Sequence, residues 1–551
     1  MKKIVASLFC VLIVNTYASN NEVVKIIDKD FKVTLDWLKD KPKSYAKDFF
    51  IIQYLKQNTT TLQNAQIAYK MAKSKSSRIK KAYSSFSSKI PNKDLKCYQL
   101  SSIKLLNEDS RCIALGLSIF EATKMSKKDL KIAIDKISDY PTLKNDFKVI
   151  ISDDPFNSLI HSNTNRFFRL FFDTRKDFRE KYINQILPNE FVNKLSKDKS
   201  INRFIAYAVH RDKLDKLQKS LFNIEDNKLI THQTLFSLAL NAIKHNQETA
   251  ALKYLQKAYK KAYFQSSKDK TLFWIYLLTQ NKAFLNEVSK SWDNNIYSLY
   301  AKELLGITST NIYYDIDIPN TKTKYDTLDQ FEWLKVDNDT KKNFDNKKLE
   351  KYSKLFTDSS TLPHYAVVLQ RYSKYKKQYF IKPFRNIMKH YDVNRQVLMY
   401  AIGRQESQFI PSAVSFATAQ GVMQIMPFLS KVLAKQLNES YNIYEQFLPE
   451  VNLRYANKHL DSLSKQFKNN PLFIAYAYNG GPGYTRKQFK RGLFVDKNRF
   501  EPFMSMEQIS YEETRKYGKR VLSNYYIYYN NLNKKDKITL SSIFQTLILP
   551  N

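Results

Sequence analysis

Glycine is scarce in this chain, which has nine glycines among 551 residues. Seven of the nine fall between Gly403 and Gly518, and only Gly116 and Gly306 precede them. Glycine permits positive φ and the close approach of a backbone to a ligand. This distribution predicts a long, nearly uninterrupted helical region followed by a compact domain with shaped loops. The functional site is expected in the second.

Long apolar runs are missing as well. After the N-terminus no stretch of 18 or more apolar residues occurs, so no stable membrane insertion is expected. Residues 1–18 combine two lysines, an apolar stretch over 4–14 and a cleavage pattern over 16–18, which predicts a secretory signal and a periplasmic mature protein. Cys10 suggests a lipoprotein instead, but apolar residues continue beyond it, whereas a lipidated cysteine ends such a run.

Metal-ligand patterns are also missing. The seven histidines are scattered, with no His-Glu-x-x-His motif and no closely spaced cysteine pair, so neither a metal nor a cofactor is expected. Beyond Cys10 the only cysteines are Cys97 and Cys112. In an exported chain such a pair predicts a disulfide, although two buried free thiols are the alternative.

Acidic residues are too few to balance the basic ones: 52 Asp and Glu face 90 Lys and Arg, a formal charge of +38. Such a charge is typical of nucleic-acid binding. No long Lys/Arg block occurs, however, and an exported chain meets little nucleic acid, so another anionic partner is expected. A Lys- and Asn-rich genome is the alternative source of the charge.

The region before the glycines is rich in helical patterns. Residues 64–74, 201–217 and 248–263 carry apolar side chains at helical spacing, without a strict repeat period. We therefore expect a mainly all-α fold, with an irregular α-superhelix over residues 19–305. The composition changes after Gly306, which predicts a short linker domain over 306–375 and a second domain over 376–551.

Glu406 is the first candidate catalytic residue. It follows Leu398 and Ile402 at i, i+4 spacing, on the face that a helix normally buries, and we expect Asp392 to cap this helix and Pro411 to end it. Burial without a cationic partner raises the pKa of a carboxyl group, as a general acid near neutral pH requires. A carboxylate at the helix rim that reaches solvent is the alternative.

Three clusters follow Glu406. Residues 419–427 contain Gly421 and Gln424, residues 475–483 read as a helix ended by a glycine-rich turn, and residues 507–517 contain Ser510 and Glu513 at capping-box spacing. Each cluster alone is explained as well by a helix cap or a packed methionine. Their order is more specific.

In this order, the motifs resemble those of the catalytic domain of the soluble lytic murein transglycosylases, which has a goose-type-lysozyme-like fold. The family's Glu-Ser pair matches residues 406–407, and its Gly-Leu-Met-Gln motif matches residues 421–424. Its Ala-Tyr-Asn-Ala-Gly motif matches residues 477–481, and its closing Glu-x-Ile-Pro-x-x-Glu-Thr-Arg-x-Tyr matches residues 507–517. Four positions depart conservatively from these patterns, Val422, Gly480, Ser510 and Thr418. Of these, Thr418 and Ser510 affect loop detail rather than chemistry.

The resemblance implies an enzyme that cleaves the β-1,4 bond between N-acetylmuramic acid and N-acetylglucosamine in peptidoglycan. Glu406 would protonate the glycosidic oxygen and then, as a carboxylate, take the proton of the muramic acid C6 hydroxyl, which yields a 1,6-anhydromuramoyl product. It also implies a ring-shaped superhelix and a set of substrate-binding residues, with Tyr476 as a substitute for Tyr478. The set is Ser407, Met423, Gln424, Tyr478, Asn479, Glu507 and Tyr517.

The expected partners are peptidoglycan glycan strands and other cell-wall enzymes. Two alternative functions stay open. One is a hydrolytic muramidase, because the lysozyme-like fold supports both outcomes. The other is a noncatalytic helical scaffold of cell-wall complexes, against which the intact motif set argues.

Overall fold

The structure is a computed structural model that describes residues 31–87, 94–496 and 499–549. The signal predicted over residues 1–18, with Cys10 in it, lies outside these residues. Within the described ranges the chain is almost entirely helical, with two strands of two residues each. The predicted, mainly all-α fold class is thereby confirmed. None of the described helices is long and apolar enough to cross a membrane.

Four helices form what we call the N-terminal unit, residues 33–87. They are α2 (Leu35–Asp40), α3 (Tyr45–Leu55), α4 (Leu62–Met71) and α5 (Ser77–Ser87). Thr34, Ser44 and Thr61 cap the first three, because each side chain accepts a hydrogen bond from a first-turn amide. The apolar faces form a separate core, which Phe331, Tyr444 and Phe447 complete from far along the chain. The N-terminal unit therefore packs against the C-terminal half.

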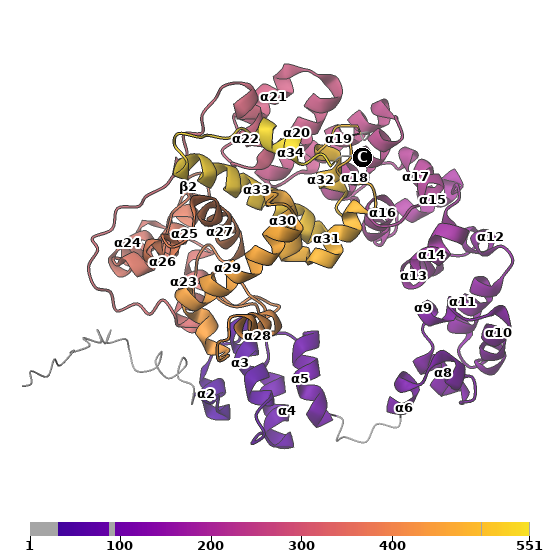
Figure 1. Ribbon diagram of the computed structural model, residues 1–551. Helices are drawn as coiled ribbons and strands as arrows, with labels where there is room; N and C mark the ends of the chain where they lie inside the picture. The colour runs from indigo at the N-terminus through magenta and orange to yellow at the C-terminus, as the bar shows by residue number, and fades with distance from the viewer. Residues whose placement is uncertain (1–30, 88–93, 497–498, 550–551) are drawn as a thin grey trace, which may run out of the picture.

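The helices from α6 to α22 follow one another in an arc, which Figure 1 shows on the right and at the top. The first are α6 (Leu95–Gln99), α7 (Ser102–Leu105), α8 (Ser110–Gly116), α9 (Ile119–Ala122), α10 (Lys127–Lys136), α11 (Pro141–Ile151), α12 (Pro155–Ile160), α13 (Thr164–Asp173) and α14 (Lys176–Phe178). There follow the π-helix η1 (Arg179–Ile183), α15 (Asn189–Ser196), α16 (Ile201–His210), α17 (Asp215–Lys219), η2 (Ser220–Asn223), α18 (His232–Lys244), α19 (Glu248–Lys261), α20 (Gln265–Thr279), α21 (Lys282–Ser289) and α22 (Ile296–Leu304).

Each helix of the arc buries one apolar stripe against its neighbours. In α19 the buried residues Ala251, Leu255 and Ala258 recur at helical spacing, and this helix packs between α18 and α20. The helix expected over 201–217 is in fact two helices, α16 and α17. Between them the chain leaves the helix, and Asp212 there forms a buried ion pair with Arg179 at 2.6 Å.

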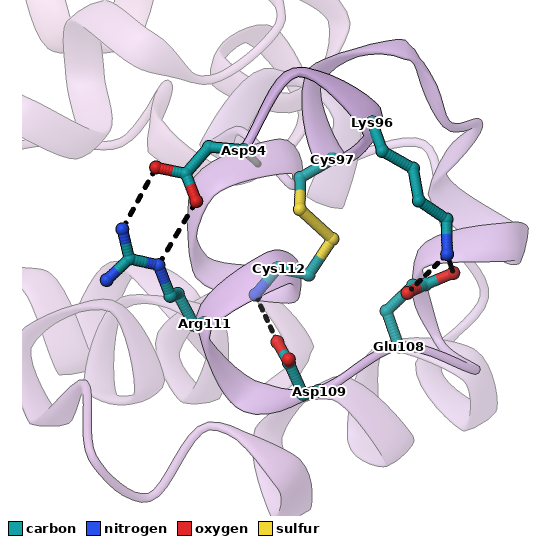
Figure 2. Close-up of a disulfide and its surroundings, with 7 residues drawn as sticks. All are labelled: Asp94, Lys96, Cys97, Glu108, Asp109, Arg111 and Cys112. Atoms are coloured by element: carbon teal, nitrogen blue, oxygen red, sulfur yellow. Dashed lines mark hydrogen bonds and ion pairs between the residues drawn. A yellow bond between two sulfur atoms is a disulfide. The ribbon is translucent and has the colours of Figure 1, made fainter. Parts of the chain in front are cut away.

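A disulfide joins Cys97 of α6 to Cys112 of α8. Figure 2 shows the bridge between two ion pairs, Asp94 with Arg111 and Lys96 with Glu108. The two cysteines are 15 residues apart in sequence. Closing a loop of this length stabilises the folded chain by about 3 kcal/mol in the loop-entropy model. The bridge thus holds the beginning of the arc, where the helices are short.

The region expected as a linker has a small core of its own. Its elements are β1 (Ile312–Tyr313), α23 (Gln330–Thr340), α24 (Asn346–Leu355), η3 (Ser359–Thr361) and α25 (Leu362–Tyr372). Tyr325, Val336, Tyr352, Phe356 and Val368 form the core. Strand β1 pairs in parallel with β2 (Gln378–Tyr379), with Ile312 opposite Gln378. This pairing ties the linker region to the segment that follows.

The C-terminal segment is built around two helices, α27 and α30, that both pack against the long helix α33. Its elements are α26 (Arg385–Met388), α27 (Val393–Glu406), α28 (Pro427–Gln436), η4 (Tyr444–Phe447), α29 (Pro449–Gln466), α30 (Pro471–Gly480), α31 (Pro482–Phe489), α32 (Phe503–Gln508), α33 (Glu512–Leu532) and α34 (Leu540–Thr546).

The arc and the C-terminal segment share one hydrophobic core. The ring of Phe273 on α20 lies 4.9 Å from that of Phe503 on α32, with an edge-on geometry. Glu303 on α22 accepts hydrogen bonds from the backbone amides of Leu540 and Ser541, at the start of α34. The last helices of the arc are therefore a wall of the C-terminal segment.

Candidate active site

Glu406 is the last residue of α27. Asp392 caps this helix as predicted, since its carboxylate accepts a hydrogen bond from the amide of Arg395. The helix ends at Glu406, earlier than the expected stop at Pro411, because Gln408 and Phe409 adopt positive φ values of 54° and 67°. The end of the helix turns the backbone away and leaves the Glu406 side chain at the edge of a partly open site.

The surroundings of Glu406 favour its protonated form. Leu398 and Ile402 on the same helix face are buried, as expected. Burial raises the pKa of Glu406 to about 7, a hydrogen bond from Tyr517 opposes this shift, and the charge of Glu513 adds to it. The Tyr517 hydroxyl donates to Glu406 Oε1 at 2.7 Å. Glu406 is therefore poised to give up a proton near neutral pH.

A tight loop over residues 413–426 forms one side of the site. Isolated bridges join Val414 to Gln420 and Gln420 to Ile425. The Ser407 hydroxyl donates to the carbonyl oxygen of Val422 at 2.7 Å, and the Tyr478 hydroxyl donates to that of Met423 at 2.7 Å. The loop is thus held against the end of α27 and against α30 by side chains of two motifs.

Gly421 is required at the turn of this loop. Its φ is +76°, and a Cβ there would lie 2.3 Å from the carbonyl oxygen of Gln446. Gln424, three residues on, also has positive φ, and its Nε2 donates to the carbonyl oxygens of Ala413 (3.1 Å) and Gly421 (2.9 Å). The Gln424 side chain therefore holds the loop closed.

The end of α30 brings the third motif to the site. The Asn479 side-chain oxygen accepts a hydrogen bond from Thr514 Oγ1 at 2.7 Å, which ties α30 to α33. Tyr478 lies close enough for the charge of Glu406 to raise its pKa, after the larger effect of burial. Tyr476 is fully buried and packs against Gly518, so of the two tyrosines Tyr478 is the one at the site.

Residues 382–500 match the family model described as "Transglycosylase SLT domain". This segment belongs to that family. The soluble lytic murein transglycosylase of Escherichia coli (strain K12) is 34% identical over 166 residues, which cover 29% of this chain and 24% of that protein. The putative soluble lytic murein transglycosylase of Haemophilus influenzae (strain ATCC 51907 / DSM 11121 / KW20 / Rd) is 32% identical over 154 residues, 28% of this chain and 25% of that protein.

These matches span about a quarter of the length of the curated relatives. Among solved structures, the 70 kDa soluble lytic transglycosylase from Escherichia coli aligns over 94% of this chain and 84% of its own, with 19% identity and a TM-score of 0.45. The family model and the two curated relatives confirm the resemblance inferred from the motifs for the SLT domain.

Glu507 lies beyond the matched segment and does not line the cleft, contrary to the expectation that it binds substrate. It lies on α32, and its side chain is 1% exposed. Its carboxylate is bound to Lys519 and to the Tyr297 hydroxyl, with Lys270 at 3.9 Å. Burial alone would raise the pKa of Glu507, but Lys270, Lys519 and Arg515 hold it below its usual value. Glu507 is therefore the centre of a buried ion cluster.

Two further expectations need correction. The Met423 side chain is fully buried, so it packs beneath the loop, and its amide donates to Asn452 Oδ1 at 2.7 Å. The capping box expected at Ser510 and Glu513 is wrong, because Tyr511 is the N-cap of α33 and no side chain caps it. Ser510 instead pairs with the hydroxyl of Tyr484 at 3.0 Å. Glu513 is exposed and acts on Glu406 through its charge.

A large cavity of about 820 Å³ lies at the opposite end of α27. Asp392, Arg395 and Leu398 are among its lining residues, and Glu406 is not. Its walls lack the perturbed carboxyl group and the motif residues that distinguish the SLT site, so the site at Glu406 carries the chemistry.

Proposed function

We propose that this chain is an exported, periplasmic lytic transglycosylase that cleaves the β-1,4 bond between N-acetylmuramic acid and N-acetylglucosamine in peptidoglycan. The observation that carries the proposal is Glu406 in an SLT domain, with a pKa raised to about 7 and a hydrogen bond accepted from Tyr517. No cofactor is needed for this reaction. Ser407, Gln424, Tyr478, Asn479 and Tyr517 would shape the glycan site around it.

In the first step Glu406 donates its proton to the glycosidic oxygen, and the bond to the leaving sugar breaks. With a pKa of about 7, a large fraction of the Glu406 carboxyl group is protonated at neutral pH and is acidic enough to donate its proton. The carboxylate that results keeps the hydrogen bond from Tyr517. That bond favours the charged form, so it stabilises Glu406 when it has become a base.

In the second step the Glu406 carboxylate takes the proton of the muramic acid C6 hydroxyl. The C6 oxygen then attacks the anomeric carbon of the same sugar, which closes a 1,6-anhydro ring. Because the substrate supplies its own nucleophile, no water is consumed and Glu406 returns to its protonated state. One carboxyl group thus suffices, whereas glycoside hydrolysis normally uses two.

Mass analysis of the fragments released from purified sacculi tests this proposal. We expect every released chain to end in a 1,6-anhydromuramic acid, one water lighter than the hydrolysed end. A standard prepared with a muramidase gives the mass of the hydrolysed fragment under the same conditions. Release of hydrolysed ends alone would replace the proposal with the muramidase alternative, and no release at all would favour the scaffold.

Glu513 gives the muramidase alternative a specific residue. Its carboxylate is near enough to raise the pKa of Glu406, and it is exposed, so it could hold a water molecule. In a two-carboxylate mechanism this second group would act as the base that activates water. In the one-carboxylate mechanism Glu513 only tunes the acid.

The variant Glu513→Gln separates these mechanisms. For the lytic reaction we expect kcat to stay within about threefold, because Glu513 is not the base. Removal of its charge lowers the pKa of Glu406, so activity is lost at a lower pH as the pH rises. The measurement is kcat/KM against pH, with Glu512→Gln as the control. A loss of roughly 10²-fold in Glu513→Gln at every pH would instead assign Glu513 as the base of a muramidase.

A further inference from the structure

A groove runs between the N-terminal unit and the SLT domain. Two cavities of about 780 and 670 Å³ adjoin there, because both are lined by Gln53, Lys56, Pro427 and Phe428. One wall is the end of α3 with one face of α5, and the other is the start of α28 with the loop before it. Figure 1 shows α28 beside α3 and α5.

This basic groove has four cationic side chains and no carboxylate among its lining residues. The cations are Lys56, Arg78, Lys81 and Lys431. All four are exposed. Within the described part of the chain, none of them has an ion-pair partner, although many other surface lysines do, such as Lys341 and Lys354. The cations therefore face one another across the groove uncompensated.

Two more features point to an anion. The groove walls shield part of the Lys56 side chain from water, and this effect and the charge of Lys431 both lower the pKa of Lys56. The N-terminus of α28 also opens into the groove at Pro427, and Met426 before it provides no side-chain cap. The partial positive charge of a helix N-terminus adds to that of the lysines. A bound anion would relieve all of these interactions.

The groove also offers apolar surface. Phe428 is 70% exposed and lies where the two cavities meet. An exposed phenylalanine of this size beside uncompensated cations suits a ligand that alternates carboxylates with short aliphatic side chains. A polyanion without apolar parts would leave Phe428 in water.

The loop over 413–426 connects the groove to the active site. The carbonyl oxygens of Val422 and Met423 contact Ser407 and Tyr478 at the site. Met426 and Phe428, a few residues further on, line the groove. A substituent on a sugar chain that is bound at Glu406 would therefore have the groove on the other side of the same short loop.

We propose that the basic groove binds the carboxylate-bearing peptide stems of the peptidoglycan strand whose glycan is cleaved at Glu406. The inference rests on the proposed function. The stems carry the two kinds of group that the groove can bind. Their carboxylates suit the four cations, and their aliphatic side chains suit Phe428. Binding of the stems uses only the four cations, Phe428 and the N-terminus of α28. No covalent step takes place in the groove.

The test compares two double variants of the full chain with equal charge. Lys81→Gln with Lys431→Gln removes one cation from each wall, and Lys80→Gln with Lys435→Gln removes exposed lysines of the same helices, α5 and α28, outside the groove. Both are made in a Glu406→Gln background, so that binding is measured without cleavage. The ligands are soluble glycan strands with their peptide stems and the same strands stripped of peptide by an amidase.

We expect the groove variant to bind stem-bearing strands roughly three- to tenfold more weakly at low salt, the value of two exposed ion pairs. Binding of stripped strands should stay within about twofold, as should both ligands with the control variant. An equal loss for stripped strands, an equal loss in the control, or no loss at all would overturn the proposal. Preferential loss of binding to a single-stranded oligonucleotide would do so as well. Because binding is measured separately from product mass, failure of the proposed reaction would not be mistaken for failure of the groove.

Discussion

Replacement of Glu406 by glutamine is expected to abolish the release of soluble fragments from peptidoglycan. The amide has nearly the shape of the carboxyl group and can still accept the hydrogen bond from Tyr517, but it can neither donate nor take a proton at the required pKa. Loss of general acid and base catalysis should lower turnover by roughly 10²-fold or more. Turnover is measured as anhydro ends formed per enzyme, at pH 6 to 8.

Stability separates this result from misfolding. Burial opposes the charged form of Glu406, so the neutral amide should leave the midpoint of thermal unfolding unchanged or slightly higher. Glu450→Gln, an exposed residue at the start of α29, serves as the matched control and should keep full activity. A Glu406→Gln enzyme that turns over within about tenfold of the wild-type rate would remove Glu406 from the mechanism.

The site was predictable where the signal is local. Glu406 could be found because Leu398 and Ile402 mark a buried helix face, and the Asp392 cap could be found because an acceptor precedes that face. Gly421 could be found because a glycine marks a position where positive φ or a close backbone approach is needed, and its φ is indeed +76°. In each case the signal comes from residues within one turn of a helix or of a loop, so neighbouring positions in the sequence are enough to reveal it.

The partners of these residues were not predictable. Asn452 holds the amide of Met423 from 29 positions away, and Thr514 holds Asn479 from 35 positions away. Glu513 looked like a capping residue because Ser510 precedes it at the right spacing, but the helix begins after Tyr511. Tertiary packing determines these contacts, and the spacing of residues within a short segment carries no information about tertiary packing.

The fold shows the same division. Single helices such as α4 and α19 lie within about three residues of their expected ends. The separate core of the N-terminal unit was not expected, because Phe331 and Tyr444 complete it across some 250 positions or more. The predicted boundaries at 305 and 375 remain predictions, and the arc and the SLT domain share one core.

The ion cluster at Glu507 is the clearest product of this shared core. Lys519 comes from α33, two residues after Tyr517, whereas Lys270 and the Tyr297 hydroxyl come from α20 and α22 of the arc. All of these side chains are buried. The cluster therefore fixes α33, which carries the hydrogen-bond donor of Glu406, against the end of the arc.

Replacement of Glu507 by glutamine should consequently destabilise the protein by about 3–5 kcal/mol, because removal of one partner leaves the buried charges of Lys519 and Lys270 uncompensated. The measurement is the free energy of unfolding in urea. Glu512→Gln is the matched control, since Glu512 pairs with Lys516 on the surface of α33. This substitution should cost less than about 1 kcal/mol of stability. Activity at low temperature, where the variant is folded, should keep an unchanged KM for soluble strands. If stability were instead preserved and KM raised severalfold, Glu507 would contact the glycan after all, and the ion cluster would not be what joins the arc to the active site.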